Sequence, residues 1–368
     1  MATPTSHMPA SMDEARGRPL SDVVLETIWH RQKVSRADLA RALGISRSTV
    51  SDIVSGLLET GLVAEAGEGP SRGGRPAILL EFRDDAHVIL GVDMGASHVA
   101  VALTDLRGRV LSWCNRDHPV REDPEGTRAL ISELCDGCLD RWGGPRDRLV
   151  GIGIAVPSPV DPRYPDRLSE TVLPAWEGET GFQRLRDRYG VPVFVDNDAN
   201  LGAVAERWWG AGRRVEHFTY IKLATGIGAG LMIGGEVYRG ATQVAGEIGH
   251  ISIDPKGDPC VCGNRGCLTT FVGGEALVAR TEAQLTKYPD SLLGKGEVTL
   301  SAIEDAARAE DPLAVKMVED AAHHLGVAIA GLLNLVNPGA VILGGGLTRA
   351  GDHLLVPLRE AVVRRTLV

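Results

Sequence analysis

Four side chains near the middle of the chain have the types and the spacing of a metal site. Cys260, Cys262 and Cys267 fall within eight positions, and His250 precedes them closely. Three thiolates and one imidazole match the tetrahedral ligand set of Zn²⁺, and four protein ligands leave no position open for a catalytic water. The sequence therefore predicts a structural zinc site; the alternative is a set of free, reduced thiols.

Glycines in the same region predict tight turns that bind a polar ligand. Residues 225–230 read Thr-Gly-Ile-Gly-Ala-Gly, and residues 246–250 read Gly-Glu-Ile-Gly-His. Glycine lets backbone N–H groups approach an anionic or polar ligand closely. A single short glycine motif is weak evidence. Two of them followed by a cysteine cluster, all in about forty residues, indicate one functional region.

Acidic and amide side chains follow two predicted strands and could contact a nucleotide or a sugar. Asp93 ends a buried strand and opens a D-x-G-x-S turn, which suits hydrated Mg²⁺ and phosphate oxygens. Asn197 and Asp198 end the strand over residues 193–195, where an amide can orient a hydroxyl group and a carboxylate can accept its proton. The alternatives are an ordinary aspartate at a strand end and an ordinary helix N-cap.

Residues 20–60 predict a helix-turn-helix with minimal connections. Apolar residues repeat at helical spacing through Trp29, Ser35 opens a second helix with a capping box, and Gly44 ends that helix. Ser46 caps a third helix that starts with Arg47 and several small hydroxyl side chains. Short donors and an arginine at this end of a helix suit the major groove and its flanking phosphates.

Two short strands with a connecting loop then have the pattern of a wing. The strands are expected at residues 62–65 and 77–80, and arginines in the loop could reach a phosphate backbone or a minor groove. Residues 1–82 hold nine basic and ten acidic side chains, so DNA affinity must come from arginines presented on one face. The expected DNA-binding residues are Arg36, Ser46, Arg47, Ser48, Thr49, Ser51, Arg72 and Arg75. The alternative is a small helical module that binds another protein.

Length and composition set further limits. The chain has 368 residues, 43% apolar content and a formal net charge of −9, which predicts two or three domains and argues against a globally basic nucleic-acid coat. We expect a cytoplasmic protein with no membrane partner, because no apolar run approaches the roughly 20 residues of a membrane span and no signal-peptide pattern is present.

Cys135 and Cys138 form a C-x-x-C pair in a predicted helix over residues 129–142, where half-buried thiols are favoured over redox or metal use.

Near residue 84 the pattern changes to alternating strands and helices, which marks a second domain. We expect a disordered leader over residues 1–18 and a winged helix-turn-helix domain over residues 19–82. An α/β domain over residues 86–368 follows, with the zinc-binding loop near residues 250–267.

With these motifs in place, the α/β part resembles the ROK family of repressors, open reading frames and sugar kinases. The stretch LATGIGAGLMIGGEVYRGATQVAGEIGH over residues 223–250 is close to the family signature. VDNDAN at residues 195–200 and CVCGNRGC at residues 260–267 are similar to its other motifs. The resemblance implies an α/β, two-lobed, actin-like or hexokinase-like ATPase fold, preceded here by a winged helix as in the transcriptional repressors of the family.

The resemblance also implies roles for individual residues. Asp198 would be the general base of a kinase, and His250 would use one ring nitrogen for zinc and the other for the sugar. The implied ligand-binding residues are Asn197, Asp198, Glu247, His250 and Ser158. The implied nucleotide-binding residues, which would hold Mg-ATP if kinase activity is retained, are Asp93, Gly95, Ser97, Thr225, Gly226, Gly228, Gly344 and Gly345. The implied zinc ligands are His250, Cys260, Cys262 and Cys267.

Departures from the family pattern help to choose between a repressor and a sugar kinase. Thr269 stands where sugar-phosphorylating members have a ligand-contacting Glu, and Ala224 replaces a glycine before the second phosphate turn. Loss of a bidentate acceptor typically costs a sugar site about one to three kcal/mol. With the winged helix, these changes favour a repressor of carbohydrate genes that binds double-stranded operator DNA and a sugar or sugar phosphate, as a homodimer or homotetramer. Retention of Asp198 favours the alternative, an ATP-dependent sugar kinase.

Overall fold

The computed structural model describes residues 19–70 and 76–367. The predicted leader over residues 1–18 and the loop residues Arg72 and Arg75 lie outside the described residues. The chain forms two compact units. The first contains the described residues up to Leu90 together with Ala102–Trp113 and Cys135–Gly151, and the second contains Gly91–Val101, Cys114–Leu134 and Ile152–Val368.

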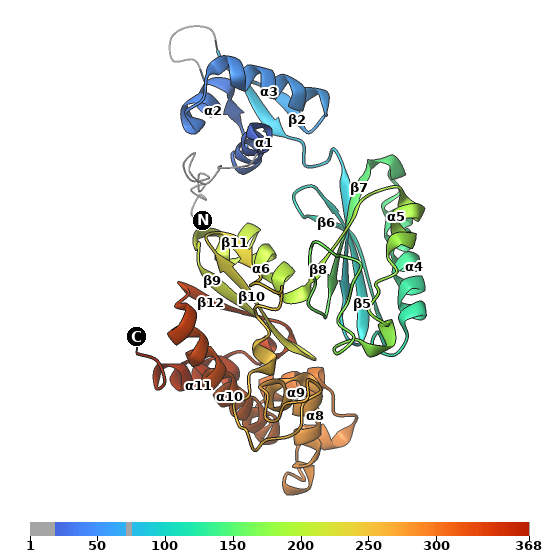
Figure 1. Cartoon of the computed structure of the whole chain (residues 1–368), viewed down its shortest axis with the longest axis vertical. Helices are drawn as coiled ribbons and strands as arrows, with labels where there is room; N and C mark the ends of the chain where they lie inside the picture. Colours follow the sequence, from blue (N-terminus) through green and yellow to red (C-terminus); the bar gives the residue numbers. More distant parts are fainter. Residues whose placement is uncertain (1–18, 71–75, 368) are drawn as a thin grey trace. The chain divides into compact units, whose positions relative to one another are not determined.

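Three helices and three short strands form a winged helix-turn-helix in the first part of the chain (Figure 1). The helices are α1 Leu20–His30, α2 Arg36–Leu43 and α3 Arg47–Glu59. The strands are β1 Val34–Ser35, β2 Val63–Glu68 and β3 Ile78–Phe82, which pair antiparallel in the order β1-β3-β2. The predicted helices and the paired strands of the wing are confirmed.

Local hydrogen bonds explain where these helices begin and end. The hydroxyl of Ser35 accepts from the backbone N–H of Asp38 at 3.2 Å, and Ser46 caps α3 in the same way by accepting from Thr49 at 3.1 Å. Gly44 ends α2 with a φ of 64°, a left-handed conformation that glycine adopts without steric cost. The inner faces of the three helices and the sheet pack in one core that includes Val24, Ile28, Leu39, Val50, Val54 and Leu80.

A five-stranded sheet carries several candidate site residues at its strand ends. Its strands are β4 Val88–Met94, β5 His98–Asp105, β6 Val110–Asp117, β7 Leu149–Val156 and β8 Val193–Asn197, in the order β6-β5-β4-β7-β8. β7 and β8 are parallel, and their last residues, Val156 and Asn197, lie opposite each other. The helices α4 Pro124–Trp142 and α5 Gln183–Tyr189 belong to this part of the chain.

A second, four-stranded sheet lies within the second unit. Its strands are β9 Phe218–Leu223, β10 Ile227–Ile233, β11 Glu236–Tyr238 and β12 Ala340–Gly344, in the order β11-β10-β9-β12. β9 pairs antiparallel with β10 and parallel with β12. In this register Lys222 lies opposite Gly228 on one side and Gly344 on the other. The central strand therefore places one lysine between two predicted nucleotide-binding glycines that are far apart in the sequence.

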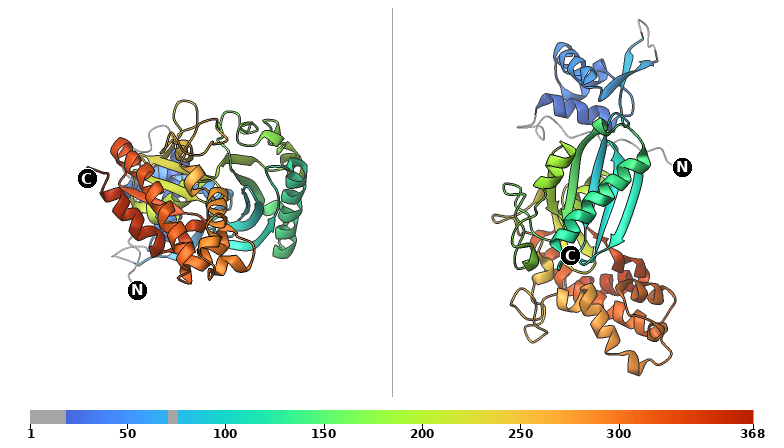
Figure 2. Two further views of the ribbon diagram at one scale, coloured as in Figure 1. Left: turned by 90° about the horizontal axis from the view of Figure 1, so that it is seen from below. Right: turned by 90° about the vertical axis from the view of Figure 1, so that its right-hand side faces the viewer.

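Helices pack around this second sheet. The helix that follows β8, α6 Asp198–Trp208, packs against β9 and β10. The later helices are α7 Thr269–Val272, α8 Gly274–Glu282, α9 Leu300–Arg308, α10 Pro312–Val336 and α11 Asp352–Val363. α10 and α11 lie side by side in all views (Figures 1 and 2), and Gly326 permits this contact because an added Cβ would lie 2.5 Å from that of Ala361.

The C-x-x-C pair lies in α4 and is fully buried, where half-buried thiols were expected. A spacing of three residues puts Cys135 and Cys138 on one helical face, and Ile131 and Leu134 share that buried face. We therefore interpret both thiols as part of the packing of α4.

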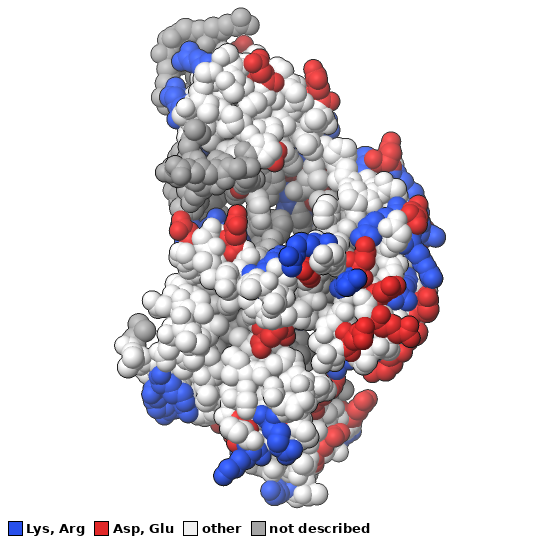
Figure 3. Space-filling view, in the orientation of Figure 1, with Lys and Arg blue, Asp and Glu red and all other residues white. Residues whose placement is uncertain are grey.

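Charged side chains of both signs lie on the described surface, among larger areas without them on the face in view (Figure 3). Figure 3 shows basic and acidic side chains intermixed on the face in view, and surface ion pairs such as Arg146 with Asp136 and Arg184 with Glu125 occur on the described helices. None of the described helices has both the length and the hydropathy that a bilayer span requires.

Candidate ligand site and metal centre

The junction of β8 and α6 places two predicted ligand-binding residues next to each other. Asn197 is the N-cap of α6, and its side-chain oxygen accepts from the backbone N–H groups of Ala199 and Asn200 at 3.0 and 3.2 Å. Its side-chain nitrogen donates to the backbone oxygen of Ser158 at 3.2 Å. The capping role that we considered as the alternative is therefore present, and it leaves one amide hydrogen of Asn197 for a ligand.

Ser158 lies in the loop after β7 and is only 1% exposed. Its hydroxyl donates to the carbonyl oxygen of Pro159 at 3.2 Å and accepts from the backbone N–H of Ser169 at 3.1 Å. The side chain of Ser158 therefore shapes this loop, and its backbone oxygen holds Asn197.

A lysine that the sequence analysis missed bonds to the candidate base. Lys222 Nζ donates to Asp198 Oδ2 at 2.7 Å, and the two side chains are 21% and 13% exposed. Burial alone would lower the pKa of Lys222, but the charges of Asp198 and Asp93 outweigh burial and raise it. Lys222 is therefore protonated at neutral pH. The available signal was a single lysine in the otherwise uncharged strand FTYIKL.

In the turn after β4, the residues of the turn bond to one another and leave little room at Gly95. The backbone N–H of Gly95 donates to the carbonyl oxygen of His98 at 3.0 Å, and a Cβ at Gly95 would lie 2.3 Å from the His98 ring. Burial favours the protonated form of Asp93, but a hydrogen bond from His98 and the charge of Lys222 lower its pKa. Ser97 is exposed at the tip of the turn. The turn that resembles a phosphate site is thus covered by an imidazole.

These residues do not fit the Mg-ATP site that the resemblance implies. Mg²⁺ requires near-octahedral oxygen ligands, one or two of them carboxylates that face the ion or its waters. Asp198 bonds instead to the Lys222 ammonium, and Asp93 lies 3.5 Å from His98 Nε2. Both carboxylates are thus engaged by side chains of the chain itself, Asp198 by Lys222 and Asp93 by His98.

The remaining predicted nucleotide-binding residues lie at the ends of strands in the four-stranded sheet. Thr225 and Gly226 form the turn between β9 and β10, where the backbone oxygen of Thr225 accepts from Gly274. Gly344 ends β12 against the ring of Tyr220, and the next residue, Gly345, has a φ of 95° that favours glycine.

A second missed residue, Arg239, fastens the segment after β11. Its guanidinium donates to both oxygens of Asp196 at 2.8 and 2.6 Å, and the two side chains are 23% and 14% exposed. Such a two-point pair fixes direction as well as distance. Because Asp196 lies in β8 just before its last residue, Asn197, the pair ties the segment that leads to Glu247 and His250 to the β8–α6 junction. Nothing in the local sequence pairs two residues that are 43 positions apart.

Glu247 is held in the site by the glycine before it. Gly246 has a φ of 98°, and its carbonyl oxygen accepts from the backbone N–H of Ala229 in β10 at 2.8 Å. A Cβ at Gly246 would lie 1.9 Å from the Ala229 oxygen, so this close approach needs glycine. Burial, with a smaller contribution from the charge of Asp198, raises the pKa of Glu247 to about 7. Glu247 can therefore gain or lose a proton near neutral pH.

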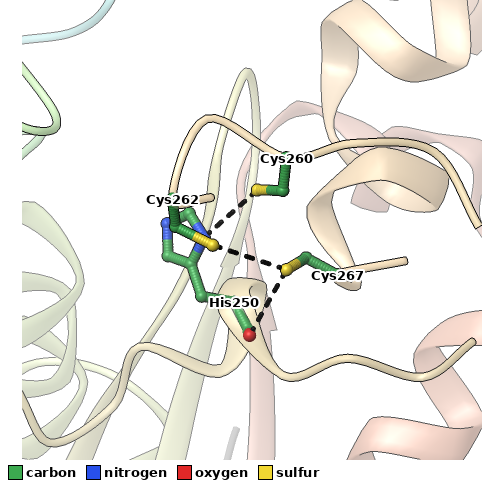
Figure 4. A group of neighbouring side chains, drawn as sticks. All are labelled: His250, Cys260, Cys262 and Cys267. Atoms are coloured by element: carbon green, nitrogen blue, oxygen red, sulfur yellow. Dashed lines mark hydrogen bonds between the residues drawn. The ribbon is translucent and has the colours of Figure 1, made fainter. Parts of the chain in front are cut away.

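The predicted metal cluster comes together after Glu247. The ligand atoms of His250, Cys260, Cys262 and Cys267 all lie within 4.8 Å of one another (Figure 4). His250 Nδ1 lies 3.5 Å from Cys260 Sγ, and the sulfurs of Cys262 and Cys267 are 3.6 Å apart. Zinc bonds of about 2.0 to 2.3 Å in a tetrahedron separate neighbouring ligand atoms by about 3.5 to 3.8 Å, so the donor set fits Zn²⁺. Because Nδ1 faces the sulfurs, Nε2 of His250 remains for a ligand.

Most of the described DNA-binding candidates lie at the start of α3, and Arg36 lies at the start of α2. Ser46, Arg47, Ser48 and Ser51 are exposed, and Thr49 is half-buried. A groove of about 330 Å³ runs between the helices and the wing; its lining residues are Ser35, Arg36, Ala37, Arg47, Ser51, Pro76, Ala77 and Ile78. Arg36 also pairs with Glu65 at 3.2 Å. The fold thus brings Arg36, Arg47 and Ser51 to one groove, while Arg72 and Arg75 lie outside the described residues.

Comparison with known proteins agrees with this arrangement of a winged helix and an α/β domain. The model of the ROK family matches residues 89–367, and the model of the iron dependent repressor N-terminal DNA-binding domain matches residues 20–69. The fold is therefore a hexokinase-like α/β domain behind a helix-turn-helix, which defines a class of DNA-binding regulators. The chain belongs to the ROK family.

The chain is similar both to transcriptional regulators and to sugar kinases of this family. A putative xylose repressor of Caldicellulosiruptor sp. strain Rt8B.4 is 33% identical over 354 residues, which cover 94% of this chain and 88% of the relative. The crystal structure of a ROK family transcriptional regulator, a homologue of the Escherichia coli MLC protein, has a TM-score of 0.81 at 28% identity and covers 95% of this chain and 88% of its own. A glucokinase from Streptomyces griseus, in complex with glucose and AMPPNP, has a TM-score of 0.69 at 32% identity and covers 76% and 90%.

Proposed function

We propose that the chain is a transcriptional repressor that binds operator DNA and responds to a sugar. The observation that carries this proposal is the combination, in one chain, of the groove beside Arg47 with a ROK domain that keeps Asp198, Glu247 and His250. The likeness to a putative xylose repressor supports it, because that likeness extends over 94% of the chain and so includes both parts.

The DNA-binding part would be residues 19–82, with α3 in the major groove. Arg47, Ser48 and Ser51 are exposed on its outer face and suit base edges and phosphates. Action on genomic DNA implies a cytoplasmic protein. A homodimer or homotetramer would present two such helices to half-sites about 34 Å apart, and a sugar that favours one conformation would change that spacing.

The sensing part would be residues 86–368. Asp198, Glu247, His250 Nε2 and one amide hydrogen of Asn197 offer acceptors and donors to sugar hydroxyls. We propose that Zn²⁺, bound by His250 and the three clustered cysteines, fixes the loop that presents His250. The ion has a structural role, because its four protein ligands leave no open position.

The second candidate function is an ATP-dependent sugar kinase. Asp198 is retained, and the similar Streptomyces griseus glucokinase was solved with glucose and a nucleotide analogue. We favour the repressor because Asp198 is bonded to Lys222 and because Thr269 stands where the family resemblance implies Glu in sugar-phosphorylating members.

The test is a selection of bound duplexes from a random DNA library, followed by titration of the selected duplex. The protein should select an inverted repeat, and one member of a panel of pentoses, hexoses and N-acetylhexosamines should weaken binding by a factor of about five or more. The same panel is assayed with ATP in parallel. Sugar-dependent ATP turnover that disappears in Asp198→Asn, without selective DNA binding, would establish the kinase instead.

A further inference from the structure

Lys222 occupies a position with unusual electrostatics in the candidate sugar site. It lies on the central strand β9 between Gly228 and Gly344, and its ammonium bonds to Asp198. The charge of Asp93 also acts on it, as do those of Asp198 and the hydroxyl of Tyr220. One partly buried cation thus acts on two carboxylates, that of Asp93 from β4 and that of Asp198 from α6.

We propose that Lys222 is a built-in cation of the sugar site, which takes the place of a divalent metal ion between Asp93 and Asp198 and restricts the site to uncharged sugars. This inference deepens the proposed function and rests on it for the identity of the ligand as a sugar. Lys222 lies in strand β9, just before the motif over residues 223–250, and is not part of any motif on which the family resemblance was based.

The first argument is charge balance. Two carboxylates that share a partly buried site attract a divalent cation. From the sequence we expect Mg²⁺ at Asp93 and the role of general base at Asp198. An ammonium at 2.7 Å from Asp198 already offsets one of these two negative charges. A second cation would meet repulsion from Lys222 and would have to displace its hydrogen bond. Lys222 keeps its charge at neutral pH, since both acids raise its pKa.

The second argument concerns the chemistry of Asp198. A kinase base accepts the proton of the sugar hydroxyl, so that the alkoxide oxygen can attack phosphorus. Here that transfer would leave a neutral acid beside the Lys222 ammonium and would lose the ion pair. Asp198 Oδ2 is bonded to Lys222, and Oδ1 can accept a hydroxyl hydrogen bond without taking the proton. Asp198 then binds the sugar and does not activate it.

The third argument excludes a phosphorylated ligand. Asp198, Asp93 and Tyr220 act on Lys222. Glu247 in turn feels the charge of Asp198, and His98 bonds to Asp93. Lys222 offsets only one of the acids, so the surroundings remain negative, and the His98 ring covers Gly95 where a phosphate would need the backbone N–H. A phosphate would meet repulsion here, whereas the hydroxyl groups of an uncharged sugar find acceptors.

The experiment measures Mn²⁺ binding to the zinc-loaded full chain by electron paramagnetic resonance. Lys222→Met removes the charge and keeps a similar side-chain volume, and Lys222→Arg is the matched control that keeps the charge. We expect Lys222→Met to gain one Mn²⁺ site with a Kd at least about tenfold below that of the wild type. The gain should be absent in Lys222→Arg and should disappear in Lys222→Met/Asp198→Asn.

A folded Lys222→Met variant that binds Mn²⁺ no better than the wild type would overturn the proposal. Zinc content and thermal melting show whether this variant is folded. If it is not, the wild type and Asp198→Asn still decide: stoichiometric Mn²⁺ bound by the wild type and lost in Asp198→Asn contradicts a built-in cation, and equal, weak binding by both supports it.

Ligand class is tested separately by thermal shift with sugars and their phosphates. An uncharged sugar should raise the Tm without Mg²⁺ or ATP, and a phosphate ester that raises it more than the free sugar would contradict the restriction. If the proposed function itself fails, neither sugars nor DNA bind, but the Mn²⁺ result is unaffected because it needs neither ligand.

Discussion

At the scale of single residues, burial decides how the acids of the candidate site behave. Glu247 and Asp198 belong to the same cluster, yet Glu247 has a pKa of about 7 while Asp198 bonds to a lysine. Burial is the larger cause of the raised pKa, and the negative charge of Asp198 adds to it. Glu247 therefore changes its charge near neutral pH, whereas Asp198 is held in an ion pair with Lys222, and the two carboxyl groups have different roles toward a ligand.

Sugar binding should release a proton below pH 7. Glu247 is mostly protonated at pH 6, and hydroxyl donors favour its ionised form, so sugar affinity should rise as pH increases through about 7. Calorimetry at pH 6 in two buffers with different ionisation enthalpies measures the released proton. Glu247→Gln should abolish this release, and Glu319→Gln, on the exposed face of α10, is the control. Equal proton release by wild type and Glu247→Gln would refute the assignment.

The same group affects stability with a definite sign. Its pKa in the folded protein lies above the ordinary value of 4.5, so the native state binds more protons than the unfolded state between pH 4.5 and about 7. The contribution of Glu247 to the free energy of unfolding therefore falls as pH rises through this window. Urea unfolding of wild type and Glu247→Gln at pH 5 and pH 8 should show a smaller pH effect in the variant.

At the scale of elements, two sets of contacts hold the segment from β11 to the cysteine loop in place. The pair of Arg239 and Asp196 fixes its beginning to β8, and the cluster around His250 fixes its end. Between these points the segment carries Glu247 on a docked glycine turn. Loss of either set of contacts should therefore weaken sugar binding, although its residues need not touch the sugar.

Arg239→Ala should lower the free energy of unfolding by about 3 kcal/mol, because it leaves the largely buried carboxylate of Asp196 without its partner. It should also weaken sugar binding. Arg163→Ala, which removes an exposed pair with Asp161, is the matched control and should change neither quantity. Chemical denaturation and calorimetry measure both effects, and a wild-type sugar affinity in Arg239→Ala would show that this ion pair does not position the site.

Cys262→Ser should lower the zinc content and the sugar affinity, since one of four ligands is lost and the loop that carries His250 loosens. Elemental analysis and calorimetry measure the two quantities. Cys114→Ser, outside the cluster, is the control. Stoichiometric zinc in Cys262→Ser, or no zinc in the wild type, would refute the metal centre.

The helix α3 leads to a separate prediction. Arg47 is exposed on its outer face, so Arg47→Ala should weaken operator binding by about 1–3 kcal/mol and leave zinc and sugar binding intact. Arg364→Ala, at an exposed position just after α11, should have no such effect. Fluorescence anisotropy at fixed salt measures the affinity, and unchanged DNA binding by Arg47→Ala would show that α3 is not the recognition helix.

At the scale of the whole molecule, the proposed repressor requires coupling between its DNA and sugar sites. Thermodynamic linkage makes this coupling reciprocal, whatever conformational change carries it. The factor by which saturating sugar weakens DNA binding must equal the factor by which saturating operator weakens sugar binding. Anisotropy and calorimetry measure the two factors independently. Unequal factors would mean that the sugar acts on assembly or on another state of the protein.

Much of the fold followed from short-range patterns. Ser35, Gly44 and Ser46 mark helix ends because capping and left-handed glycine act over three or four residues. The cluster of His250 with three cysteines was likewise predictable, because its ligands are close in sequence and their chemistry is specific.

The sequence by itself determined the order of the elements, the cysteine cluster and the family, since each depends on local spacing and residue type. Only the tertiary structure decided that the backbone oxygen of Ser158 holds Asn197, and that Lys222 and Arg239 pair with acids far away in the chain. Burial and ion pairing depend on which strands become neighbours, and strand neighbours are set by long-range packing that no local pattern records.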